Sequence, residues 1–270
     1  MLCVIAIVGI ELMDSRIKTV SRFHQITNID LIGTIYSETK KSGFGGFLKS
    51  KIFKNSISAP INQELRKIRH EITSQDGKII LISSLKAGEG KSHLTYQLAY
   101  SLGVIDKRVL VIDTNFRGES FFKKKLSGQE QLEVDVSSLL PPSRVGTDEK
   151  ESESIIFENY FITPKKNENV HIMTHKKPKG SAAEVLAGRD FEKMLRTLIE
   201  TGIYDYIFME GSAINDYSDT LELSSFSDKL ILVFNAMSEF TTADRHSLTS
   251  LTSLENKLMG GILNQATSQV

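Results

Sequence analysis

Short apolar runs alternate with amphipathic stretches along most of the chain. The apolar runs have the length of β-strands and lie at residues 78–84, 108–113, 170–173, 206–210, 229–234 and 261–264. The stretches between them carry apolar residues at helical spacing, at residues 61–72, 93–102, 181–201, 219–225 and 241–258. Alternating strands and helices predict an α/β fold with a mostly parallel sheet flanked by helices on both faces.

Two stretches add detail to the predicted fold. In the first predicted helix, Leu65, Ile68 and Ile72 share one face, while Arg66 and Arg69 project elsewhere. Residues 118–167 are polar and rich in charge, with a PPS turn at 141–143 and an acidic run at 148–153. We expect this interval to be a variable surface excursion.

The loop after the strand at 78–84 has the residues of a phosphate-binding loop. Glycines at 88 and 90 allow backbone N–H groups to turn onto phosphate oxygens, and the following helix adds its partial positive charge. Lys91 can reach the β and γ phosphates, and the Ser92 hydroxyl can ligate Mg²⁺. Strand, loop and helix therefore predict a nucleoside triphosphate site.

The match to the consensus G-x-x-x-x-G-K-[ST] is imperfect, because Leu85 occupies the position of the first glycine. An ordinary glycine turn with a solvent-facing lysine is the alternative. The next strand, at residues 108–113, follows at the spacing of a βαβ unit and ends in Asp113, where an α/β sheet places its ligand. This context favours the nucleotide site.

Composition narrows the class of protein. The 270 residues include 33 basic and 33 acidic side chains, so wholesale electrostatic binding to nucleic acid is not expected. Cys3 is the single cysteine, which excludes an intramolecular disulfide framework and a zinc ribbon. His171 and His175 flank a strand end with no third ligand evident, so we expect structural roles for them.

The N-terminus begins with an apolar run at residues 1–10, about half of the ~20 residues that a membrane-spanning helix needs. It lacks the basic region and the small-residue cleavage site of a signal peptide. Arg16, Lys18 and Arg22 follow, as the positive-inside bias predicts for a cytoplasmic flank. We interpret residues 1–13 as the end of a transmembrane or juxtamembrane segment; a buried first strand is the alternative.

Residues 14–59 form the next predicted unit, a basic juxtamembrane linker. Its lysines at 40, 41, 49, 51 and 54 alternate with phenylalanines at 44, 47 and 53. Two interpretations stay open: a mobile basic loop, or a segment on an anionic lipid surface, where each lysine contributes about 1 kcal/mol. We expect the nucleotide-binding domain at residues 60–270.

With these elements placed, residues 14–264 resemble the cytoplasmic domain of bacterial tyrosine kinases, the autokinases attached to capsular and exopolysaccharide co-polymerases. This group belongs with the MinD and ParA ATPases. The Walker motifs of the family resemble AGEGKS at 87–92, DTNFR at 113–117 and YDYIFME at 204–210. Further similar passages are ELMDSRIK at 11–18, DLIGTI at 30–35, QELRKIR at 63–69, AEVL at 183–186 and ILN at 262–264.

The resemblance implies ATP or ADP as the ligand, together with Mg²⁺. It places the nucleotide against Lys86, Ala87, Gly88, Glu89, Gly90, Lys91, Ser92, His93 and Asn264, with Asn264 near the base. It implies catalytic roles for Asp113, Glu210 and Lys91, and metal ligation by Ser92, Asp113 and Glu210.

The resemblance also implies partners and a location. Gln63, Arg66 and Arg69 resemble the family's E-x-x-R-x-x-R motif, which is used in ring assembly, so a homo-oligomer is expected. The other expected partners are the polysaccharide co-polymerase or export machinery and the membrane surface, with no nucleic acid. The expected location is the cytoplasmic face of the inner (plasma) membrane.

Several positions depart from the family pattern. Asn115 stands where the family has a second Walker A′ aspartate, Glu210 where it has the Walker B aspartate, and residues 211–213 read GSA instead of TPP. Asn115 cannot accept a proton, and loss of a general base typically costs about 10²- to 10⁴-fold in rate. Tyr217 is the last tyrosine of the chain, so the family's C-terminal tyrosine cluster is missing, and Gln63 lacks the charge of the assembly glutamate.

The sequence is compatible with three functions. The first is an ATP-binding tyrosine-kinase-like domain that is catalytically impaired and regulates polysaccharide assembly, chain length or export. The second is an active protein-tyrosine autokinase or ATPase in which Asp113 and Glu210 suffice. The third is a membrane-associated ATPase of the MinD and ParA type, in which Lys86 contacts the nucleotide of a partner subunit; Lys86 could equally be a loop lysine with no partner.

Overall fold

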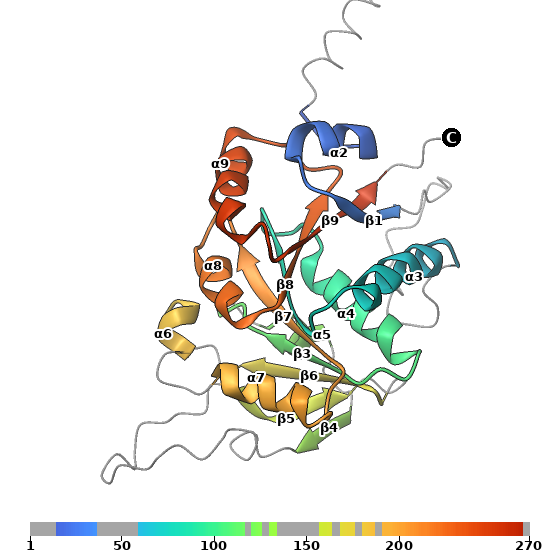
Figure 1. Cartoon of the computed structure of the whole chain (residues 1–270), viewed down its shortest axis with the longest axis vertical. Coiled ribbons are helices and arrows are strands. Elements are labelled where there is room, and N and C mark those ends of the chain that lie inside the picture. Colours follow the sequence, from blue (N-terminus) through green and yellow to red (C-terminus); the bar gives the residue numbers. More distant parts are fainter. Residues whose placement is uncertain are drawn as a thin grey trace, which may run out of the picture.

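The computed structural model describes residues 15–36, 59–116, 120–125, 130–133, 157–163, 168–175, 180–186 and 191–266. Within these residues, nine strands form one sheet in the order β1-β9-β8-β2-β7-β3-β6-β5-β4 (Figure 1). Neighbouring strands from β1 to β6 in this order run parallel, whereas β5 pairs antiparallel with both β6 and β4. The predicted α/β fold with a mostly parallel sheet is confirmed.

The centre of the sheet consists of strands that the sequence marks by their apolar runs. They are β2 (Ile79–Ser84), β3 (Val109–Asp113), β6 (Val170–His175), β7 (Tyr206–Ala213), β8 (Lys229–Asn235) and β9 (Leu258–Ala266). Every residue of β2, β3 and β7 is buried. Strands covered on both faces require apolar side chains at successive positions, which is why these runs do not alternate with polar residues.

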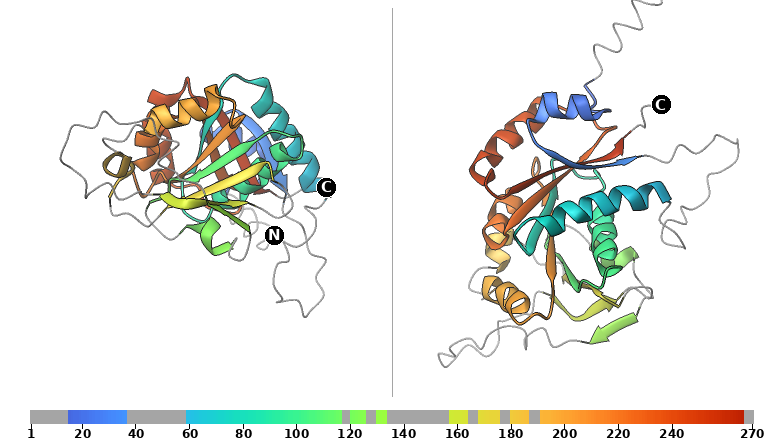
Figure 2. Two further views of the ribbon diagram at one scale, coloured as in Figure 1. Left: turned by 90° about the horizontal axis from the view of Figure 1, so that it is seen from below. Right: turned by 45° about the vertical axis from the view of Figure 1, so that its right-hand side comes forward.

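Helices cover both faces of the sheet, as the two views of Figure 2 show. On one side lie α3 (Ala59–Ser74) and α4 (Lys91–Gly103), whose buried residues join one hydrophobic cluster with Ile80 and Val111. On the other side lie α2 (Val20–Thr27), α6 (Ala182–Leu186), α7 (Phe191–Glu200), α8 (Asp219–Leu223) and α9 (Thr242–Ser250). Buried residues of α2, α6, α7 and α8 join a second cluster with Leu81 and Leu110, and the partly buried Leu248 of α9 packs against it.

Some predicted elements differ from the structure in extent. The helix expected at 181–201 is two helices, α6 and α7, separated by residues outside the described part of the chain. Two 3₁₀ turns, η3 (Ser224–Phe226) and η4 (Leu251–Leu254), follow α8 and α9, so the last predicted helix ends at Ser250.

The expected surface excursion at 118–167 is partly wrong. It contains α5 (Phe121–Lys125), β4 (Glu130–Glu133) and β5 (Phe157–Thr163), and the two strands extend the sheet beyond β6. Both strand sequences, FENYFIT and EQLE, mix polar and apolar residues, so neither stands out from the polar interval around it. The remaining residues of the interval, including the PPS turn and the acidic run, lie outside the described part.

The folded domain begins earlier than residue 60. Residues 15–36 contain α2 and β1 (Leu31–Tyr36), and β1 pairs with β9 at the sheet edge. Phe23 of α2 is fully buried, with its ring centroid 5.0 Å from that of Phe234 in β8. Gly33 lies against α3, where a Cβ atom would come within 2.2 Å of Ile68 Cγ1. This part of the expected linker therefore belongs to the domain.

The N-terminal prediction is untested. The apolar run at 1–10, the segment expected at 1–13 and the lysine-rich stretch at 40–54 all lie outside the described residues. Among the residues that the structure describes, no helix combines the length and the hydropathy needed to cross a bilayer.

Asp228 stabilises the sheet at the end opposite the phosphate loop. Its Oδ2 accepts hydrogen bonds from the backbone N–H groups of Lys78 (2.8 Å) and Ile79 (2.9 Å), and Arg196 Nη1 donates to its Oδ1. Burial opposes ionisation, but the Arg196 hydrogen bond and the two N–H donors outweigh it and lower the pKa of Asp228. The ionised form is therefore the one that stabilises the fold.

We expect Asp228→Asn to lower the free energy of unfolding at neutral pH by on the order of 1 kcal/mol, because the site is partly solvent-screened. Since the folded pKa is lowered, this contribution is present above the unfolded pKa and is lost as the pH falls through the folded pKa. Urea unfolding between about pH 7 and pH 3 tests this. The difference between the two proteins should shrink at acid pH, whereas the exposed neighbour variant Asp76→Asn should show little difference throughout. A difference that persists undiminished at acid pH would contradict the assignment.

Candidate nucleotide site

The loop between β2 and α4 lies at the carboxyl end of the parallel strands. Gly88 (φ +82°) and Gly90 (φ +92°) adopt the left-handed conformation that favours glycine, and Gly90 forms the N-cap of α4. A Cβ atom at Gly90 would lie 2.2 Å from Asn264 Nδ2. Leu85, where the consensus has glycine, is buried in the hydrophobic core. The loop thus keeps glycine where the backbone requires it and uses the other position for packing.

Asn264 has a contact other than the expected one. Its Nδ2 donates to the main-chain oxygen of Glu89 at 3.0 Å, and its Oδ1 accepts from the backbone N–H of Gln265. The side chain therefore supports the phosphate loop from the end of β9. Its expected role near a nucleotide base stays a prediction.

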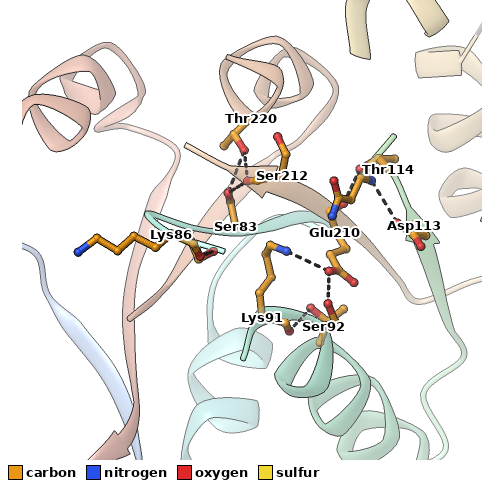
Figure 3. Close-up of polar contacts among 12 residues, drawn as sticks. Ser83, Lys86, Lys91, Ser92, Asp113, Thr114, Glu210, Ser212 and Thr220 are labelled. Carbon is orange, nitrogen blue, oxygen red and sulfur yellow. Dashed lines mark hydrogen bonds and ion pairs between the residues drawn. The ribbon is translucent and has the colours of Figure 1, made fainter. Parts of the chain in front are cut away.

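Lys91 and Ser92 converge on Glu210, as Figure 3 shows. Lys91 Nζ lies 3.0 Å from Glu210 Oε1, and the Ser92 hydroxyl donates to the same oxygen. Both charged side chains are largely buried, with exposed fractions of 10% for Lys91 and 2% for Glu210. Glu210 is long enough to reach across from β7 to the start of α4.

Asp113 completes an acidic pair with Glu210. The two residues are register partners on the adjacent strands β3 and β7, so both carboxyl groups lie at the same level of the sheet. Burial, followed by the charge of Glu210, raises the pKa of Asp113 to about 7, although hydrogen bonds from Ser120 and Asn115 and the charge of Lys91 oppose the rise. Asp113 can therefore exchange a proton near neutral pH.

Glu210 carries an unfilled acceptor. Its Oε2 is buried and has no hydrogen-bond partner in the described structure. A buried carboxylate oxygen without a donor is costly, and a Mg²⁺ ion or its coordinated water is the kind of group that would satisfy it. With the Ser92 hydroxyl and Asp113 nearby, the oxygen ligands fit the expected metal.

The set also fits nucleotide phosphates. Lys91 supplies a cation, and the glycine turn forms a close cradle at the N-terminus of α4. The described residues contain no cluster of three or more His, Cys, Asp or Glu side chains suited to a metal ion. A P-loop does not need such a cluster, because the phosphates themselves supply metal ligands.

The sequence did not indicate that His175 borders this site. Its Nε2 lies 3.1 Å from the main-chain oxygen of Asn115 and 3.8 Å from Asp113 Oδ1. His171, on the same strand, lies 2.8 Å from the Tyr204 hydroxyl through Nδ1. His175 ends β6, the strand next to β3. This position would have indicated that it borders the site, but only once the order of the strands in the sheet is known.

Lys86 is held within its own chain. Its Nζ forms an ion pair with Asp244 Oδ2 at 2.7 Å and donates to the main-chain oxygen of Glu239. In Figure 3 its side chain points away from the cluster of Lys91, Ser92 and Glu210. This structure has Lys86 bound within its own chain, and contact with a second subunit would require Lys86 to leave Asp244. Both interpretations of Lys86 stay predictions.

The residues expected in ring assembly lie on α3. Gln63 and Arg66 are exposed, whereas Arg69 Nη1 donates to the main-chain oxygen of Ser101 at 2.7 Å. Burial lowers the pKa of Arg69, and the charge of Arg66 contributes. Arg69 thus joins α3 to the end of α4, and the expected role of the three residues between subunits stays a prediction.

Comparisons with known proteins address the fold. No protein-family model matches the chain. An iron–sulfur cluster carrier protein of Rickettsia conorii is 24% identical over 111 residues, a match that spans 41% of this chain and 28% of that protein. The chain thus matches only about a quarter of the curated relative's length.

Solved structures match over much more of the chain. The chimerical protein CapA2B2 has a TM-score of 0.69 at 18% identity and covers 93% of this chain and 100% of its own. The kinase domain of the Escherichia coli tyrosine kinase Etk has a TM-score of 0.63 at 17% identity, covering 90% and 92%. The BceF tyrosine kinase domain has a TM-score of 0.62 at 16% identity, covering 92% and 98%. The chain has the fold of bacterial tyrosine kinase domains.

Proposed function

We propose that this protein is an ATP-binding, tyrosine-kinase-like domain that regulates the assembly, chain length or export of a capsular or exopolysaccharide, with reduced catalytic power. The observation that carries the nucleotide part is the convergence of Lys91 and Ser92 on the acidic pair of Glu210 and Asp113 beside a glycine cradle. The polysaccharide part rests on the motif resemblance and on the shared fold.

Each residue has a defined task in this proposal. Lys91, Ser92 and the backbone of residues 87–90 bind the phosphates, and Ser92, Asp113 and Glu210 hold Mg²⁺. When bound, MgATP supplies the γ-phosphoryl group for transfer. Asn115 donates its backbone N–H to Asp113 Oδ1 at 3.1 Å, but its side chain cannot take a proton from an acceptor hydroxyl. The residues present therefore support nucleotide binding more strongly than phosphoryl transfer.

We propose that the domain works at the cytoplasmic face of the inner membrane, next to a polysaccharide co-polymerase or export machinery. The lysines at 40, 41, 49, 51 and 54 support proximity to anionic lipid. The exposed side chains of Gln63 and Arg66 on α3 leave a surface for contact between copies of the chain.

One paired assay tests the nucleotide part. Purified protein is titrated with ATP and Mg²⁺ by calorimetry, and phosphate release and phosphotyrosine are measured in the same sample. Saturable binding with little turnover supports a nucleotide-dependent switch. Absence of ATP binding would overturn the proposal.

An active kinase or ATPase is the second candidate, favoured by the pKa of about 7 at Asp113. A carboxyl group with this pKa is suited to general base catalysis at neutral pH. If Asp113 acts as the base, turnover should rise with pH as its carboxyl group ionises, because the ionised form is the active one. A rate that does not change with pH would exclude Asp113 as the base.

A further inference from the structure

Glu89 is a buried carboxylate within the phosphate loop itself. Its residue is 4% exposed, and its Oε2 accepts the backbone N–H of Lys86 at 3.1 Å. The backbone N–H of Asn235, at the end of β8, also donates to its side chain. Its main-chain oxygen accepts from Asn264 Nδ2 at the end of β9. Glu89 therefore joins the loop to the ends of two strands.

The charged groups around Glu89 come from two elements. Lys86 of the same loop favours the ionised carboxylate, and Asp244 of α9 opposes it. Because Lys86 Nζ forms an ion pair with Asp244, its positive charge stabilises the ionised form of Glu89 less than an unpaired lysine would. The neighbours from β8 and β9, Asn235 and Asn264, are uncharged. Burial is the largest effect and raises the pKa of Glu89 to about 7.

Nucleotide phosphates would add negative charge to this loop. Like charges repel more strongly at the low effective dielectric constant of a protein than in water, so bound phosphates would disfavour the ionised carboxylate of Glu89. A neutral carboxylic acid escapes this repulsion, and its carbonyl oxygen can still accept the N–H of Lys86. The loop can thus keep its shape while its charge changes.

We propose that Glu89 is a positioning residue of the phosphate loop that takes a proton from solvent when nucleotide phosphates bind, so that nucleotide affinity falls as the pH rises above neutrality. This inference rests on the proposed nucleotide site. It assigns to this glutamate a task other than contact with the ligand: in both forms its side chain accepts the N–H of Lys86 and holds the loop, and the neutral form avoids repulsion of the phosphates.

Calorimetry with ADP and Mg²⁺ tests the proposal. Titrations in two buffers of different ionisation enthalpy at pH 7 give the number of protons taken up, and titrations at pH 6 and pH 8 give the change in affinity. Relative to Glu89→Gln, we expect the wild type to take up about half a proton more at pH 7 and to lose up to about tenfold more affinity from pH 6 to pH 8. Glu89→Gln, a neutral side chain of the same shape, should lose both effects.

Two controls separate Glu89 from other groups. Glu89→Gln keeps Asp113, the other carboxyl group with a pKa of about 7, so only the proton uptake that this variant loses is assigned to Glu89. Glu89→Asp keeps a titratable group and should retain proton uptake. Near-UV circular dichroism checks that each variant is folded.

The outcomes are distinct. Equal proton uptake by the wild type and a folded Glu89→Gln would overturn the assignment to Glu89 and leave the nucleotide site intact. If Glu89→Gln does not fold, titration of the wild type with ADP in the absence of Mg²⁺ decides, because Mg²⁺ binding at Asp113 then releases no proton and ADP binding without proton uptake overturns the proposal. Absence of ADP binding by the wild type would overturn the proposed function as well.

Discussion

Lys91→Met is expected to weaken ATP binding by at least about 100-fold, the equivalent of about 2.7 kcal/mol. Lys91 is the buried cation at the start of α4, and its present partner is the carboxylate of Glu210. A phosphate bound in the cradle would lose its charge-assisted hydrogen bond in the variant. Calorimetry with ATP and Mg²⁺ measures the effect.

Removal of Lys91 also leaves Glu210 as an unpaired buried charge, which destabilises folds by about 3–5 kcal/mol. The double variant Lys91→Met/Glu210→Gln removes both charges, so its thermal unfolding should recover while its ATP affinity stays low. Lys86→Met is the matched control in the same loop: its side chain points away from the cluster, and its loss should change the ATP affinity only a few-fold. Wild-type affinity in Lys91→Met would refute the P-loop assignment.

Restoring the family carboxylates is expected to raise turnover by about 10²-fold or more, the range typical of a general base. The variant is Asn115→Asp/Glu210→Asp. An aspartate at 115 would supply a second carboxylate beside Asp113, whose Oδ1 already accepts the backbone N–H of residue 115. The shorter side chain at 210 would no longer reach both Lys91 and Ser92, which frees them for phosphate and metal.

Turnover is measured as phosphate release and as phosphorylation of a tyrosine-containing peptide that is added as the acceptor. Adding Lys91→Met to the double variant should abolish the gain and serves as the control for a contaminating kinase. If the wild type already turns over ATP as fast as an active double variant, Asp113 and Glu210 suffice for chemistry, which favours the second candidate function.

The local sequence was enough for the central strands and the phosphate loop. The apolar runs at β2, β3, β7 and β8 predict buried parallel strands because both of their faces are covered. Glycines at 88 and 90 followed by Lys91 and Ser92 mark the loop because left-handed backbone and a phosphate-binding cation need those residue types. The similarity of residues 113–117 and 204–210 to the family's Walker motifs also predicted Asp113 and Glu210 as site residues.

Long-range packing decided the remainder. No local pattern shows that β1 joins β9, because its six residues become a strand only through pairing with β9 and packing against α3. The contact of Lys86 with Asp244 and the position of His175 beside Asp113 join residues far apart in the chain. The sequence by itself thus determined the fold class, the central strands and the phosphate loop, whose signals lie within a few neighbouring residues. Only the tertiary structure decided the sheet edges and the ion pairs, because strand order and side-chain partners depend on which segments meet in space.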